Sequence, residues 1–60
     1  MNQQLVKILC FALAEYARIA AMKAANQARI ARDEAIAYPE NEFNTSASAL
    51  YNLALEAANL

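Results

Sequence analysis

Apolar residues recur at helical spacing along the first part of the chain, and no glycine or proline interrupts them between residues 3 and 37. Alanine, leucine and long charged or amide side chains dominate this stretch, and all of them are strong helix formers. The dipeptide Tyr38-Pro39 ends the pattern, because proline forces the residue before it out of the helical region. The sequence therefore predicts one long helix over about residues 3–37, followed by a loop over 38–44.

A second, shorter apolar pattern follows this loop. Asn44, Thr45 and Ser46 are residue types that cap helix N-termini, and they predict a short helix over about residues 45–59. Folded back on the first helix, it would form an αα-hairpin. No repeat or linker interrupts the chain, so we expect residues 1–60 to form a single all-α domain.

A stripe of small residues follows one side of the long helix, at alternating spacings of four and three. This is the a/d pattern of a coiled coil, sustained for about four heptads. Small side chains let two helix backbones approach closely, so the stripe favours tight helix–helix packing. Alanine is frequent elsewhere in the chain, which leaves coincidence as the alternative. The stripe consists of Cys10, Ala14, Ala17, Ala21, Ala24, Ala28, Ala31 and Ala35.

Large apolar side chains form a second stripe, concentrated in the N-terminal half of the long helix. A second helix of about 15 residues spans about 22 Å, so we expect it to reach back only to about Met22. The large residues beyond that point would need a partner, because burying each of them is worth about 1.5–3 kcal/mol. We therefore predict a dimeric helical bundle. The predicted oligomer interface comprises Leu5, Ile8, Leu9, Leu13, Tyr16 and Ile19, together with Ala14, Ala17, Ala21, Ala24 and Ala28.

A third side of the long helix is polar and basic. Its spacing allows ion pairs between Glu15 and Arg18 and between Arg29 and Asp33, as on an ordinary solvated surface. Two apolar residues interrupt this side, however, which is unusual for a solvated face. The other interpretation is a strip that docks an acidic partner or a phosphate backbone. Its residues are Lys7, Phe11, Arg18, Met22, Arg29 and Arg32.

Composition narrows the range of functions. The chain has 60 residues, of which 60% are hydrophobic, and a formal net charge of −1. A chain of this size buries only about 60% of its unfolded surface, and its single cysteine offers no internal disulfide to compensate. With no histidine and no glycine, the usual catalytic base, metal ligand and phosphate-binding loop are missing. We expect no enzyme activity, no cofactor and no metal.

These observations predict a small protein–protein interaction module, an inhibitor or adaptor of the kind found as accessory proteins of viruses and mobile elements. It would act as a homodimer or higher oligomer, as a four-helix bundle, and bind another protein. Two alternatives stay open: a nucleic-acid-binding hairpin dimer that uses the basic strip, and a structural subunit of a filament or shell. Lys7, Glu15 and Arg18 interrupt the only long apolar run, so no membrane span is expected. The lone cysteine agrees with a cytoplasmic location.

Overall fold

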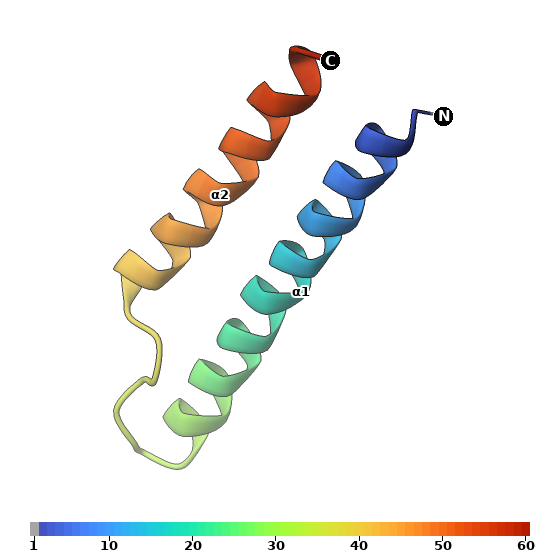
Figure 1. The fold of residues 1–60 in the computed structure, drawn as a ribbon. Helices are drawn as coiled ribbons and strands as arrows, with labels where there is room; N and C mark the ends of the chain where they lie inside the picture. Colours follow the sequence, from blue (N-terminus) through green and yellow to red (C-terminus); the bar gives the residue numbers. More distant parts are fainter. Residues whose placement is uncertain (1) are drawn as a thin grey trace.

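The computed structural model describes residues 2–60 and consists of two α-helices joined by a loop (Figure 1). Helix α1 spans Gln3–Ala31 and helix α2 spans Glu40–Ala58. The helices lie side by side and run antiparallel, in a body that measures 47 × 18 × 9 Å. The predicted all-helical hairpin is therefore confirmed. Its assembly into a dimeric bundle lies beyond a single chain and stays a prediction.

Helix α1 ends at Ala31, well before the predicted end at residue 37. Asp33 has a φ of 58°, which is the left-handed conformation. The N–H of Asp33 donates to the carbonyl of Ile30 at 3.0 Å, and the N–H of Glu34 donates to the carbonyl of Arg29 at 2.8 Å. These two bonds form a Schellman motif, which usually needs glycine at the left-handed position. Aspartate tolerates this conformation better than most residues, so the helix stops before the proline is reached.

Asn26 then holds the loop against the last turns of α1. Its side-chain oxygen accepts hydrogen bonds from the N–H groups of Ala37 at 3.1 Å and Tyr38 at 3.0 Å. Its Nδ2 donates to the Tyr38 carbonyl at 2.8 Å. The chain is thus folded back beside α1 before α2 begins, which allows α2 to lie along the N-terminal part of α1.

Helix α2 begins at Glu40, earlier than predicted, with Pro39 as its N-cap and no side-chain cap bond. Glu40 and Glu42 lie in the first turn, where the helix macrodipole favours negative charge. The predicted caps, residues 44–46, were wrong because they lie inside the helix, and Ser46 is fully buried. The acidic first turn after the proline was the sequence signal for the true start.

The two helices pack through residues spaced alternately by three and four. Ile8 and Met22 are the buried hydrophobic residues of α1, at 8% and 2% exposure. This 3.5-residue average is the repeat of helices that wrap around each other with a left-handed twist. The seam consists of Leu5, Ile8, Ala12, Glu15, Ile19 and Met22 from α1 and Phe43, Ser46, Leu50, Leu53 and Ala57 from α2.

This seam corrects the expected coverage of α1. Helix α2 has 19 residues and spans about 28 Å. Because it starts near Met22 and runs towards the N-terminus, it covers part of the stripe that we expected to stay open. The interface residues that α2 buries or half-buries are Leu5, Ile8 and Ile19. Those that stay exposed are Leu9 at 50%, Leu13 at 59% and Tyr16 at 67%.

Candidate interaction surface

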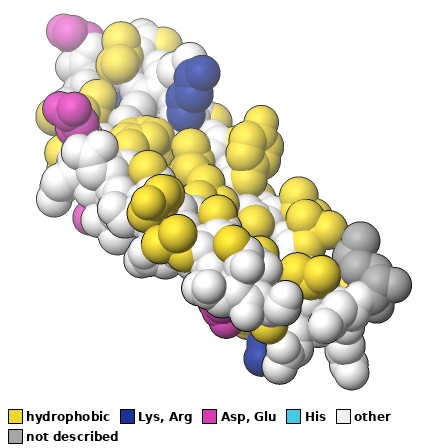
Figure 2. All heavy atoms as spheres, turned by 90° about the horizontal axis from the view of Figure 1, so that it is seen from above, with side chains coloured by type: hydrophobic (Ala, Val, Ile, Leu, Met, Phe, Trp, Pro, Cys, Tyr) yellow, Lys and Arg dark blue, Asp and Glu magenta, His cyan; other side chains and the backbone are white. Residues whose placement is uncertain are grey.

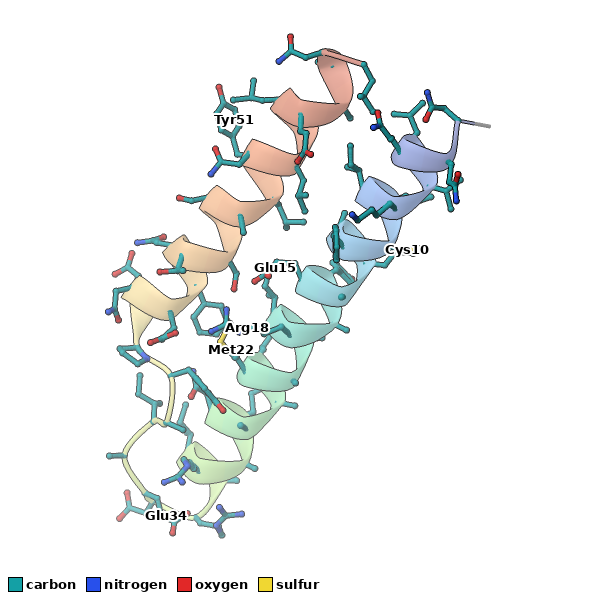
Figure 3. All side chains as sticks on the ribbon, in the orientation of Figure 1. Cys10, Glu15, Arg18, Met22, Glu34 and Tyr51 are labelled. Atoms are coloured by element: carbon teal, nitrogen blue, oxygen red, sulfur yellow. The ribbon has the colours of Figure 1, made fainter. Side chains whose placement is uncertain are left out.

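A polar cluster interrupts the apolar seam near its middle. Arg18 of α1 donates through Nη1 to the hydroxyl of Ser46 and to the Glu15 carboxylate at 3.3 Å, and through Nη2 to the Glu42 carboxylate at 3.1 Å. Figure 3 shows Glu15 and Arg18 pointing from α1 towards α2. The predicted ion pair between Glu15 and Arg18 is confirmed. Its arginine also ties the two helices together through Ser46 and Glu42.

The hydrogen bonds of this cluster change the acidity of Glu15. Its pKa lies below the ordinary value of 4.5, chiefly because the Ser46 hydroxyl hydrogen-bonds to the carboxylate. Arg18 lowers the pKa further through its own hydrogen bond and its positive charge, while partial burial opposes these effects. The Ser46 hydroxyl therefore accepts from Arg18 and donates to Glu15. A carboxylate held ionised in this way suits a structural role better than general acid catalysis.

Few of the large hydrophobic side chains are buried by contacts within the chain. Of the described residues, Ile8 and Met22 are buried, whereas eleven large hydrophobic side chains are exposed. Figure 2 shows hydrophobic side chains along the length of the face in view. The accessible surface is 4625 Å², although a compact monomer of 6.6 kDa should expose only about 3,900 Å². The excess of about 700 Å² marks a surface suited to binding.

The exposed hydrophobic residues include one continuous side of the hairpin, on which α1 and α2 enclose an apolar groove of about 350 Å³. Next to it, towards the loop, a second hollow contains Tyr16. Among the described residues that line these two hollows, Lys23 alone is charged. We name this side the apolar face. It comprises Leu5, Leu9, Ala12, Tyr16, Ile19, Ala20 and Lys23 of α1 and Leu50, Ala54 and Ala57 of α2.

Most of the predicted alanine stripe lies on the side of α1 turned away from α2, although Ala14 lines the hollow that contains Phe11 and Ala24 lines the one that contains Tyr16. Cys10 is exposed, and Figure 3 places it on the outer side of the helix. Contact within the chain is made by the larger seam residues, so the stripe stays a prediction for contact with another chain. The stripe residues proposed for the oligomer interface are all exposed: Ala14, Ala17, Ala21, Ala24 and Ala28.

The structure divides the predicted basic strip into separate parts. Met22 is 2% exposed and lies between the helices, so it is not available at the surface. Arg18 belongs to the polar cluster, and Arg32 donates through Nε to Glu34 at 2.7 Å. The predicted pair between Arg29 and Asp33 is not among the ion pairs of residues 2–60, because the helix ends before Asp33.

Lys7 and Phe11 remain together as an exposed pair. The Lys7 ammonium lies 5.7 Å from the centroid of the Phe11 ring, which is the geometry of a cation–π interaction. Phe11 is 53% exposed and lines a hollow of about 490 Å³ with Arg18 and Glu56. This mixed polar and apolar surface is distinct from the apolar face.

Metal sites and membrane spans are two further features to assess in the described residues. No group of three or more cysteine, aspartate or glutamate side chains within residues 2–60 is placed to hold a metal ion. Neither of the two described helices contains an apolar stretch long enough to cross a membrane. The chain matches no protein-family model, and comparisons with curated proteins and with solved structures also give no match.

Proposed function

We propose that the protein is a small, non-enzymatic protein–protein interaction module that works as a homodimer, with the apolar face as the contact between copies. The excess of exposed surface carries this proposal. A standard interface buries about 800 Å² per partner, and the chain exposes about 700 Å² more than a compact monomer of its mass. One contact of standard size would therefore bring its surface to the expected value.

The chemistry of the apolar face supports a second hairpin as the occupant. Aromatic and aliphatic side chains form its centre and charge is depleted there, as at the core of protein interfaces. A pair of helices with one apolar side is half of a four-helix bundle, and a second pair completes it. Side chains such as Leu9 and Tyr16 contribute about 1.5–3 kcal/mol each when fully buried. Several of them on each chain can offset an association cost of about 4–15 kcal/mol.

The Lys7–Phe11 pair supplies a second surface, which we propose for a different protein, as in an inhibitor or adaptor. Phe11 is an aromatic side chain of the kind enriched at protein interfaces. Because Phe11 lines a hollow separate from the apolar face, this surface would stay open in the homodimer. Arg29 lies near the end of α1 and adds positive charge that favours an acidic partner, whereas Arg32 is paired with Glu34.

Nucleic-acid binding is less well supported. Arg18 and Arg32 are each paired with carboxylates, and the net charge is −1, so little positive charge is left for phosphates. A filament or shell would need a contact that does not close on itself. The mass of the assembly in solution distinguishes such a filament or shell from a dimer.

A pair of matched variants tests the proposed interface. Leu9→Glu places a charge on the apolar face, outside the seam, so the hairpin should remain helical by circular dichroism and become monomeric by light scattering. Leu55→Glu is the control, because Leu55 is similarly exposed at 47% but lies about 160° around α2 from the seam residue Leu53. It should remain dimeric. A dimeric Leu9→Glu variant would overturn the choice of this face.

A further inference from the structure

We infer that the second copy lies antiparallel on the apolar face and that each chain inserts its Tyr16 into the apolar groove of the other. This inference rests on the homodimer proposed above and adds its direction and its central contact. It follows from the positions of the groove, of Tyr16 and of Lys23 along the same face.

The groove lies at the end of the hairpin away from the loop. Three of its lining residues, Ala12, Ala54 and Ala57, are alanines, and their small side chains leave the space between the helices open. The remaining lining residues are leucine and isoleucine, so the described groove carries no charge. It is therefore suited to a large apolar or aromatic side chain.

Tyr16 is placed to be that side chain. It follows Leu9, a lining residue of the groove, by one heptad, so it lies on the same side of α1 about 10 Å nearer the loop. It is 67% exposed and lines the second hollow together with Lys23. Its aromatic ring has little cover within its own chain.

A two-fold axis makes every contact between copies reciprocal. In a parallel dimer the two copies lie level with each other, so groove would face groove and each Tyr16 would lie at the level of the other Tyr16, away from both grooves. An antiparallel dimer whose axis passes at the level of residues 12 and 13 places residue 16 at the level of residue 9 in the second copy. This arrangement brings the exposed ring of each chain to the groove of the other.

The charge at Lys23 favours the same direction. A parallel dimer would bring two Lys23 ammonium groups to the same level on an apolar face, where like charges repel. The antiparallel dimer carries each Lys23 to the end of the second copy at which α2 finishes. It thereby separates the two ammonium groups by about 30 Å along the bundle, well beyond the screening length at physiological salt.

Distances between spin labels test the direction. The label is attached at Ala28→Cys, on the outer side of α1, in a Cys10→Ser background. The antiparallel dimer places the two labels about 45 Å apart or more along the bundle. A parallel dimer would place them within about 30 Å, the width of the bundle with its labels, and would overturn the inference.

A second label position separates the failure of this inference from that of the homodimer. The two native Cys10 residues lie at nearly the same level of the bundle in either direction, within about 30 Å of each other, so labels on them should couple in any such dimer. Coupling at Cys10 together with a short distance at position 28 would leave the homodimer standing and contradict the antiparallel direction. A lack of coupling at both positions would contradict the homodimer and, with it, the inference.

Substitutions at Tyr16 test the insertion itself. Tyr16→Ala should raise the dimer dissociation constant at least about tenfold, as expected for an interface anchor, whereas Tyr16→Phe should keep the dimer because the ring still fills the groove. Phe11→Ala is the matched control, because it removes an exposed aromatic ring outside the apolar face and should change the constant less than about twofold. An equally small change for Tyr16→Ala would overturn the insertion.

Discussion

Replacing Ser46 with alanine should destabilise the hairpin, because this serine connects the charged groups of the polar cluster. Its side chain is 0% exposed. The hydroxyl accepts a hydrogen bond from Arg18 and hydrogen-bonds to Glu15. Alanine keeps nearly the same volume in the seam and loses both bonds.

The expected cost follows from these two bonds. Each intramolecular hydrogen bond contributes about 0.5–1.5 kcal/mol net, so losing both costs about 1–3 kcal/mol. Alanine favours the helix over serine by about 0.5 kcal/mol, which offsets part of the loss. The net destabilisation should be about 1–2 kcal/mol. In a chain of this size it lowers the melting temperature by about 5–15 °C.

Ser48→Ala provides the matched control, because Ser48 lies on the same helix but is exposed. Thermal unfolding of both variants and of the unmodified protein is followed by circular dichroism at one protein concentration, since association also affects the melting temperature. Ser48→Ala should melt at or slightly above the unmodified protein, and Ser46→Ala well below it. Equal melting temperatures in the two variants would refute a stabilising role for the Ser46 hydroxyl.

Three further predictions concern the helix end, the loop and the response to acid. Asp33→Gly should raise the free energy of unfolding in urea by about 0.5–1 kcal/mol, because glycine adopts a positive φ without the strain of a Cβ, and a lower value would contradict the Schellman motif. Asn26→Ala removes three hydrogen bonds to the loop and should cost about 1–4 kcal/mol and speed up hydrogen exchange of the loop amides. Gln27→Ala, at the exposed neighbouring position, should not speed it, and equal exchange in both variants would count against this role of Asn26. The lowered pKa of Glu15 stabilises the fold above about pH 5, and this stabilisation disappears as the pH falls through the lowered pKa. The melting temperature should therefore fall more steeply below about pH 5 in the unmodified protein than in Glu15→Gln, and parallel curves would contradict this.

Local sequence signals predicted the helical hairpin but misplaced both helix ends at the loop. The long run without glycine or proline indicated α1, and Pro39 indicated the loop. The true end of α1 depends on Asp33 in a left-handed conformation that glycine normally occupies, so no strong local signal in the sequence indicated it. This early end, together with the loop held by Asn26, places α2 beside residues 5–22 of α1.

The side chains between the helices were harder to predict, because their surroundings come from distant parts of the chain. Ser46 has the residue type of an N-cap, yet it is buried by packing and bonds to Arg18, 28 residues away in the sequence. In the sequence pattern Met22 lies on the same side of the helix as basic residues, yet it is buried in the seam because α2 packs over it. Which side of α1 becomes the seam depends on the position of α2, and residue spacing within α1 alone cannot decide it.

The mass of the native assembly tests the central claim most directly. The chain has a mass of 6.6 kDa, and sedimentation equilibrium over a range of micromolar concentrations measures whether it associates. The homodimer proposed for the apolar face predicts a mass about twice that of one chain, reached at a dissociation constant in or below the micromolar range. A mass that stays at that of a single chain across the whole range would contradict it.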